Sequence, residues 1–155
     1  MNALTTIRND YHAIDELFGV YNRSRSLLLK EKVAQRLGEA LRLNASITQT
    51  VLFPVARQRS IALATLVGRG SEEHQLLGFT LADLEKLLAG PAESLERAQR
   101  LDAVVQSLFE FFNQHFSGWK TYLEPALLGA LTSAELESVG ALLVEGRLFI
   151  QRSMP

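Results

Sequence analysis

The sequence contains no cysteine, which excludes disulfide bonds, thiolate metal ligands and cysteine nucleophiles together. Its net charge is only -1, and the basic residues are spread thinly, so the basic patch that nucleic-acid binding requires is missing. The longest apolar runs are too short to span a bilayer, and the start, MNALTTIRNDYH, lacks the basic-then-apolar order of a signal peptide. We therefore expect a soluble, cytoplasmic protein that binds neither nucleic acid nor a membrane.

Signatures of enzyme chemistry are also missing. The sequence has no glycine-rich phosphate loop, no Ser/His/Asp arrangement in a recognisable context and no pair of carboxylates on an inward helix face. No segment alternates apolar and polar residues as a half-buried strand does. With 155 residues and 47% hydrophobic content, the chain can bury a core as one domain, 1–155. These features predict an all-α, non-enzymatic protein.

Apolar residues three and four positions apart predict a first amphipathic helix over residues 3–21. The polar segment NRSRS that follows predicts a turn. A second helix is expected from near Leu27 to Pro54, because a proline lacks the backbone N–H and should kink or stop it. Helix then resumes for a turn or two, to about Val67, before the segment GRG breaks it.

A third helix is expected to begin after Ser71, which is a suitable N-cap. Glu72 and Glu73 follow in its first turn, where negative charge complements the helix dipole. Leucines one turn apart then mark its buried side: Leu77, Leu81, Leu84 and Leu88. Gly90 and Pro91 form the pair expected where one helix ends and the next begins.

A fourth helix is expected from about 92 to Pro125 or a little beyond. Thr132 and Glu135 then form a capping box, and Leu131 and Leu136 a hydrophobic staple, so a short fifth helix follows. Four long amphipathic helices with short connections pack most simply side by side. The sequence therefore predicts an antiparallel up-and-down four-helix bundle with a short fifth C-terminal helix.

One sequence pattern, two residues one helical turn apart followed by a proline, occurs twice in the chain. In FFNQHFSGWKTYLEP, His115 and Trp119 lie one helical turn apart on a side that is otherwise apolar. In NASITQTVLFP, Asn44 and Thr48 take the two corresponding places, and each stretch ends in a proline at the same offset. Bundles build their sites in the core, from residues on facing helices. The inward pairs 44/48 and 115/119 are therefore the candidate site.

These stretches resemble the hemerythrin-like family, the HHE cation-binding domains. RNDYHAIDELF looks like the family's first-helix histidine segment, and SEEHQLLGFTLADLEKLL looks like its third-helix histidine segment. VLFP and YLEP look like the endings of its second and fourth helices, and LTSAELESVGALL like its C-terminal stretch. The resemblance covers nearly the whole chain and implies a four-helix bundle.

In that family, two irons are held by one histidine each from the first and third helices and by a His-x-x-x-Glu pair from each of the other two. Three positions of this chain match the ligands: His12, His74 and His115. Three are vacated: Asn44, Thr48 and Trp119. Both carboxylates are among the losses, and two divalent ions in a low-dielectric core need anionic ligands. Asp15 or Glu16 would be a replacement carboxylate only if it faced inward.

Packing and hydrogen bonding indicate what replaces the metal. An inward Trp119 would occupy the space of the metals, with Gly78 and Gly118 making room for its ring. Buried polar groups need partners, so we expect a relic network in which Asn44 and Thr48 hydrogen-bond the histidines. Two tyrosines are candidates to join that network: Tyr11 and Tyr122.

Three functional hypotheses follow. The first is a hemerythrin-like bundle with a degenerate site and no cofactor, in a non-catalytic binding or regulatory role. The second is a protein that holds iron, or another single transition metal, through His12, His74 and His115 for oxygen, nitric oxide or metal handling. The third is a structural module that forms a homodimer through Leu27 to Leu29 or the face of the last helix.

Overall fold

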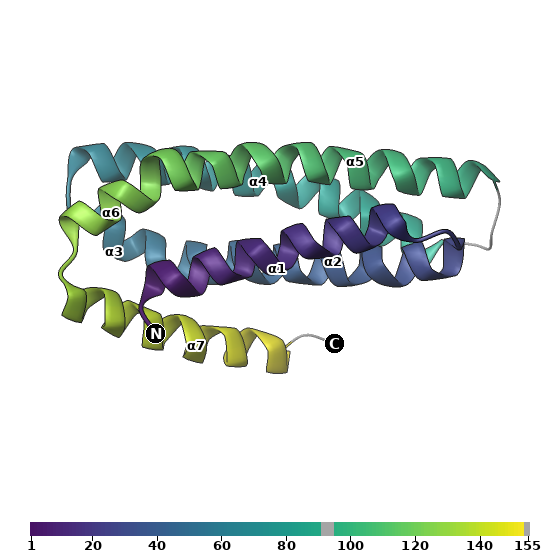
Figure 1. Ribbon diagram of the computed structural model, residues 1–155. Helices are drawn as coiled ribbons and strands as arrows, with labels where there is room; N and C mark the ends of the chain where they lie inside the picture. The colour runs from purple at the N-terminus through teal and green to yellow at the C-terminus, as the bar shows by residue number, and fades with distance from the viewer. Residues whose placement is uncertain (91–94, 154–155) are drawn as a thin grey trace.

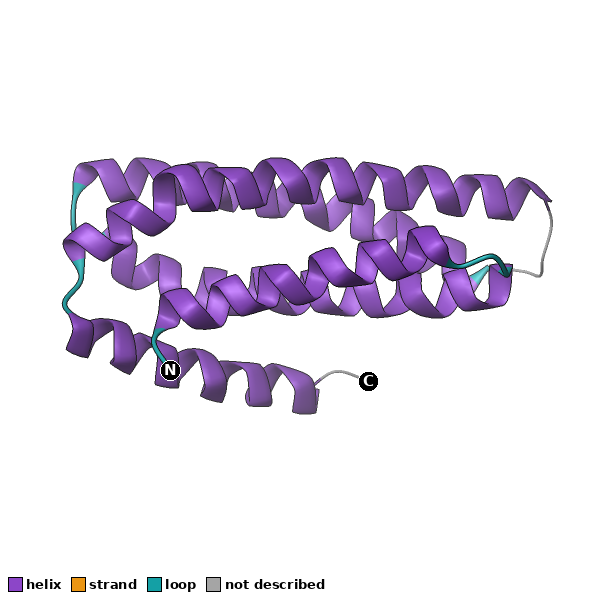
Figure 2. Ribbon diagram, in the orientation of Figure 1, coloured by secondary structure: helices purple, strands orange, loops and turns teal. Residues whose placement is uncertain are grey.

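The computed structural model describes residues 1–90 and 95–153, and these are almost entirely helical, with no strand among them (Figure 2). The elements are α1 (Ala3–Arg23), α2 (Leu27–Ile47), the π-helix η1 (Thr48–Leu52), α3 (Phe53–Arg57), α4 (Ile61–Ala89), α5 (Leu95–Gly118), the π-helix η2 (Trp119–Leu123), α6 (Glu124–Ala130) and α7 (Ser133–Ser153). Among the described residues, no single helix is long and apolar enough to cross a membrane. Only taken together, across a bend of 119°, do Leu95–Ala130 and Ser133–Ser153 have the length and apolar composition of a membrane span.

The helices run alternately up and down, and the predicted bundle is confirmed (Figure 1). α1 packs against α2, and α4 packs against α5 and α2. α7 lies across the outside of the bundle against α1 and α2. Arg147 on α7 donates to both carboxylate oxygens of Asp10 on α1, at 2.7 and 2.6 Å, and so ties the last helix to the first.

Helix starts follow local capping chemistry. The side chains of Asn2, Ser26 and Ser60 each accept a hydrogen bond from the backbone N–H three residues later, at 3.0 to 3.1 Å. The predicted capping box is confirmed: Thr132 N–H donates to Glu135 Oε1 and Glu135 N–H donates to Thr132 Oγ1, both at 3.2 Å. These contacts satisfy backbone donors that have no partner inside a helix.

The predicted start of the third long helix was wrong. α4 begins at Ile61 and continues through the segment GRG, so Ser71 lies inside the helix and Glu73 is not in its first turn. Gly70 does not break the helix, because the Phe53 ring packs on it: a Cβ there would come within 2.8 Å of Phe53 Cζ. Burial of that ring offsets a glycine cost of about 1 kcal/mol.

The sequence pattern that occurs twice also has the same local structure in both places. A π-helix begins at Thr48 and another at Trp119, and Phe53 N–H and Glu124 N–H each donate to the carbonyl oxygen five residues back. A proline follows immediately in both, at the first turn of α3 and of α6. The wider turn accommodates a residue without an N–H, so helix continues past both prolines. The predicted start of the fourth helix, near 92, lies outside the described residues.

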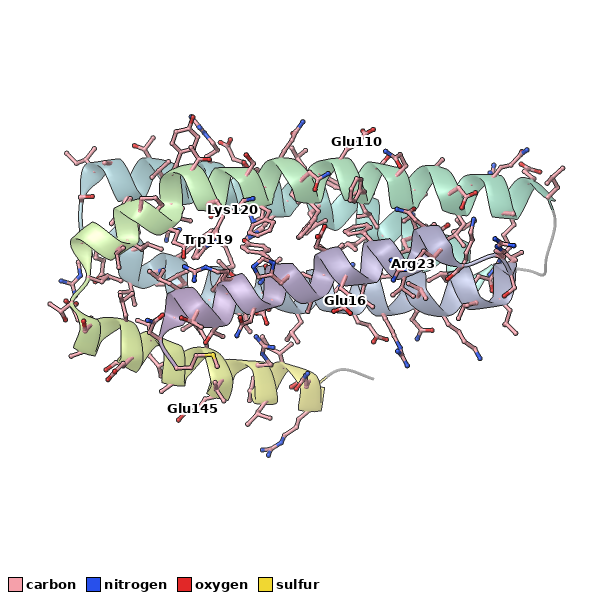
Figure 3. All side chains as sticks on the ribbon, in the orientation of Figure 1. Glu16, Arg23, Glu110, Trp119, Lys120 and Glu145 are labelled. Carbon is pink, nitrogen blue, oxygen red and sulfur yellow. The ribbon has the colours of Figure 1, made fainter. Side chains whose placement is uncertain are left out.

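Aromatic rings connect α1 to α5. Tyr11 stacks on Phe116 with ring centroids 4.8 Å apart, and Phe18 lies 5.5 Å from Phe112. Figure 3 shows Trp119 between the helices, whereas the labelled charged side chains lie on the outside: Glu16, Arg23, Glu110, Lys120 and Glu145. The half of the bundle that contains both π-helices therefore holds a cluster of rings in which polar atoms are embedded.

Candidate functional site

The structure brings together two of the three candidate histidines. The rings of His74 on α4 and His115 on α5 have centroids 5.0 Å apart in the bundle interior. His12 lies on the exposed side of α1, where its ring meets the edge of Phe116 at 5.8 Å. Asp15 and Glu16 are exposed as well, so neither points inward as a replacement carboxylate.

The three positions that the family resemblance predicts to be vacated all face the core. Asn44, Thr48 and Trp119 are 6%, 1% and 3% exposed. The Trp119 ring lies edge-on to Tyr11, with ring centroids 5.8 Å apart. The expectation that glycines make room for this ring was wrong, because a Cβ on either would meet nothing within 4 Å: Gly78 and Gly118.

The expected relic network was also wrong. Asn44 Nδ2 and Thr48 Oγ1 have no hydrogen-bond partner among the described residues, and Tyr122 is 58% exposed. The histidines bond to flanking residues instead. His115 Nδ1 donates to the Glu73 carboxylate, and His74 Nδ1 lies 3.3 Å from Gln49 Oε1, which also accepts from Ser71 Oγ at 3.1 Å.

Glu73 and Gln49 are the site residues that sequence reasoning missed. Each is the immediate neighbour of a predicted site residue: Glu73 precedes His74, and Gln49 follows Thr48. Glu73 was assigned to a helix start, whereas in mid-helix its side chain reaches across to α5. Gln49 lies inside the π-helix, whose wider turn changes the direction of each side chain, and no sequence signal located that turn.

Burial and the His115–Glu73 pair shape the ionisation of the site. The hydrogen bond from His115 lowers the pKa of the Glu73 carboxyl, which stays ionised. Burial, together with charge on His115, lowers the pKa of His74 to about 4, so this imidazole is neutral at pH 7. Burial above all, then the charges of Glu73 and Asp10, raise the pKa of the Tyr11 phenol. Tyr11 therefore keeps its O–H and can donate.

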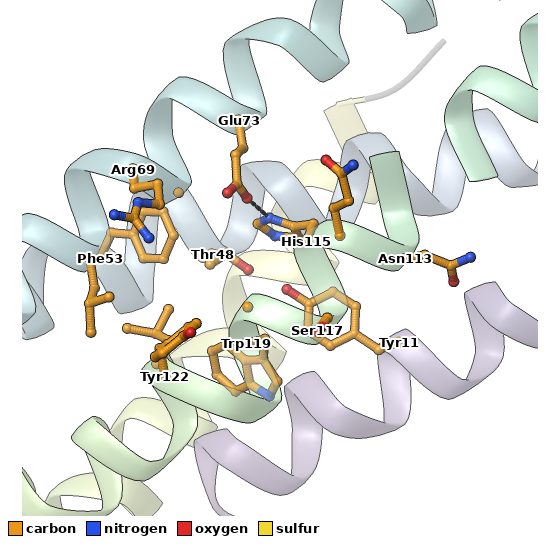
Figure 4. A pocket seen from close by; sticks show the side chains of 15 residues that line it. Tyr11, Thr48, Phe53, Arg69, Glu73, Asn113, His115, Ser117, Trp119 and Tyr122 are labelled. Atoms are coloured by element: carbon orange, nitrogen blue, oxygen red, sulfur yellow. Dashed lines mark hydrogen bonds and ion pairs between the residues drawn. The ribbon is translucent and has the colours of Figure 1, made fainter. Parts of the chain in front are cut away.

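A pocket of about 440 Å³ opens beside this pair, between α4 on one side and α5 and η2 on the other (Figure 4). Tyr11 and Thr48 reach it from the interior, since both are buried. Four apolar side chains line it: Phe53, Leu66, Trp119 and Leu123. The rest of the lining consists of two glycines and a set of polar and charged residues: Gly70, Gly118, Arg69, Glu73, Asn113, Gln114, His115, Ser117 and Tyr122.

Unpartnered polar atoms are concentrated in the same region. Among the described residues, five buried side-chain atoms have no hydrogen-bond partner: Tyr11 Oη, Asn44 Nδ2, Thr48 Oγ1, His74 Nε2 and Trp119 Nε1. All belong to candidate-site residues or to Tyr11, which contacts His115 and Trp119. A buried polar group without a partner costs about 1 to 3 kcal/mol. A polar molecule in the pocket that satisfied Tyr11 Oη and Thr48 Oγ1, whose residues line it, would therefore be favoured.

The side chains do not fit a two-iron centre. Within residues 1–90 and 95–153, no group of three or more His, Asp or Glu side chains is arranged to hold a metal ion. The Glu73 carboxylate is already hydrogen-bonded to His115, and the indole of Trp119 is not a metal ligand. Comparisons with models of known protein families, with curated proteins and with solved structures find no match for this chain.

Proposed function

We propose that the chain is a hemerythrin-like bundle whose metal site has been lost and whose core now binds a small molecule, in a non-catalytic and regulatory role. The helix order and the repeated sequence pattern at 44/48 and 115/119 support the family relationship. Each vacated position is buried, as a former ligand position would be. Fold-level resemblance supplies the ancestry, and the binding role rests on the site itself.

One observation carries the proposal: Trp119, one helical turn after His115, is 3% exposed and lines a pocket. The indole supplies apolar packing in place of an anionic ligand. Around it, Tyr11 Oη and Thr48 Oγ1 face the pocket without partners. Small-molecule sites have this composition, with a mostly apolar lining and a few polar groups that orient the ligand.

A binding role agrees with the chemistry of the lining. His115 and Glu73 form an acid-base pair, but among the described residues no hydroxyl is hydrogen-bonded to that pair as a nucleophile would be. Nucleophilic catalysis depends on such contact between nucleophile and base. The pair instead holds α4 and α5 at a defined spacing along one wall of the pocket.

Elemental analysis tests the loss of the metal. Protein purified without chelator or affinity metal should contain well under one iron per chain and should lack the near-ultraviolet oxo-bridge bands of a diferric centre. The physical reason is the absence of both bridging carboxylates at positions 48 and 119. Stoichiometric iron together with such bands would refute the proposal.

Binding of one metal ion is a second candidate function, and the unpartnered Nε2 atom of His74 favours it. His74 Nε2 is buried and unpartnered, and the low pKa of this imidazole, about 4, keeps it in the neutral form that metal ligation needs. Its ring is 5.0 Å from that of His115. Sub-stoichiometric iron that increases to one ion per chain on addition of ferrous salt would favour this candidate.

Self-association is a third candidate, favoured by exposed apolar side chains. On α2, Leu28 and Leu29 are 57% and 46% exposed, and on α7, Leu142 and Phe149 are 49% and 73% exposed. Exposed apolar side chains that gather into a patch are typical of interaction sites. Light scattering coupled to size-exclusion chromatography distinguishes a dimer from a monomer.

A further inference from the structure

The pocket between α4, α5 and η2 contains features that specify its ligand. We propose that it binds a small organic acid, with the carboxylate at Arg69, an apolar body between the walls and a second hydrogen-bonding group at Tyr11 and Thr48. This inference rests on the proposed binding function and names the chemistry of the ligand. Three independent observations contribute, one for each part of the molecule.

The first observation is the charge balance of the lining. One arginine, one glutamate and one histidine line the pocket, Arg69, Glu73 and His115, and the last two are paired with each other. Among the described residues, the exposed Arg69 makes no direct ion pair; its charge reaches Glu73 only at longer range, where it helps to lower the pKa of that carboxyl. A guanidinium presents two parallel N–H donors that match a carboxylate, so an arginine without a direct partner at a pocket favours one carboxylate.

The second observation is the apolar wall. Phe53 and Leu66 line the pocket from the α3 and α4 side, and Trp119 and Leu123 line it from η2. The volume of about 440 Å³ lies in the range of small-molecule sites, about 300 to 1,000 Å³, and far exceeds the space one inorganic ion needs. An apolar body such as a single aromatic ring would therefore be part of the ligand.

The third observation is the pair of hydroxyls at the buried end. Tyr11 and Thr48 are each 1% exposed, line the pocket and have no hydrogen-bond partner for Oη and Oγ1. The Tyr11 ring contacts that of His115, with centroids 5.9 Å apart, whereas Arg69 reaches the pocket from α4, on the left in Figure 4. Because a hydroxyl both donates and accepts, a ligand hydroxyl or carbonyl can satisfy both residues.

Trp119 makes binding directly measurable, because it is the single tryptophan of the chain and lies in the pocket wall. The probes are 4-hydroxyphenylacetate, its amide, which has the same shape without the charge, and phenylacetate, which lacks the hydroxyl. Each is titrated against the full chain, with Trp119 fluorescence and saturation-transfer NMR as readouts. We expect the acid to bind about tenfold or more tighter than the amide, and phenylacetate to bind more weakly than the hydroxy acid.

Variants assign the effect to residues. Arg69→Gln should weaken binding of the acid more than binding of the amide and so remove the preference for the acid, while Arg69→Lys should keep part of that preference. Gly118→Leu should abolish binding of all three probes, because Gly118 lines the pocket and a Cβ there meets nothing within 4 Å. Gly129→Leu is the matched control, since this glycine is equally unobstructed but lies outside the pocket lining.

The outcomes separate the two proposals. If acid and amide bind the parent equally, or if Arg69→Gln keeps the preference, the assignment of an organic acid is overturned while a binding pocket remains. If no probe binds at millimolar concentration, or if all probes bind Gly118→Leu as well as Gly129→Leu, the pocket itself is refuted and the proposed binding function fails with it. Should Gly118→Leu not fold, the Arg69 variants still decide the ligand class.

Discussion

Replacing Trp119 by alanine tests whether this ring stabilises the core. The side chain is 3% exposed and contacts the Tyr11 ring. A buried aromatic side chain removes about 150 to 250 Å² from water, which at about 25 cal/mol per Å² corresponds to about 4 to 6 kcal/mol. This is an upper limit, because the unfolded chain already hides part of that area.

We therefore expect Trp119→Ala to lower the free energy of unfolding by about 3 to 5 kcal/mol, the usual range for such truncations. Tyr122→Ala is the matched control, because Tyr122 lies in the same π-helix but is 58% exposed. Its substitution should cost about 0.5 kcal/mol or less. Urea denaturation followed by far-ultraviolet circular dichroism measures both, since the first variant has no tryptophan to report.

Two results would refute the reasoning. Equal costs for Trp119→Ala and Tyr122→Ala would show that burial of the indole contributes nothing beyond an exposed ring. Red-shifted, readily quenched tryptophan emission from the parent protein would show that Trp119 faces water. Conversely, added indole should partly restore the stability of Trp119→Ala, because a ligand that binds only the folded state stabilises it.

The remaining predictions concern metal and pH. EDTA should leave the melting temperature unchanged, since a structural ion stabilises only if the folded state binds it, and a drop of many degrees would reveal a bound metal. The triple variant Asn44→His, Thr48→Glu, Trp119→Glu should be less stable than the parent without metal, because its glutamates are buried unpaired, and should regain stability with ferrous iron; a well-folded variant that binds no more iron than the parent would refute the positional match. Because His74 has a pKa of about 4, below its ordinary value of 6.5, the unfolded state takes up its proton first; stability should be full above pH 6.5 and should fall by up to about 3 kcal/mol as the pH is lowered to about 4. Urea midpoints across that range should fall less steeply for His74→Gln, and an identical slope would contradict the assignment.

The sequence by itself determined the long helices and the repeated pattern at 44/48 and 115/119. Three-and-four spacing marks the long helices because one face must be buried, and Thr132 and Glu135 mark a helix start because their contacts are local. The inward places of Asn44, Thr48 and Trp119 were readable for the same reason, since helical period alone decides which residues share a face.

Only the tertiary structure decided where α4 begins and what the histidines contact. Gly70 reads as a helix breaker until the Phe53 ring, from a distant part of the chain, packs on it. Glu73 and Gln49 have no local signal, because their partners lie on other helices and the π-helix redirects Gln49. A pattern along one helix specifies a face, whereas a hydrogen bond between helices depends on how the two faces are set against each other.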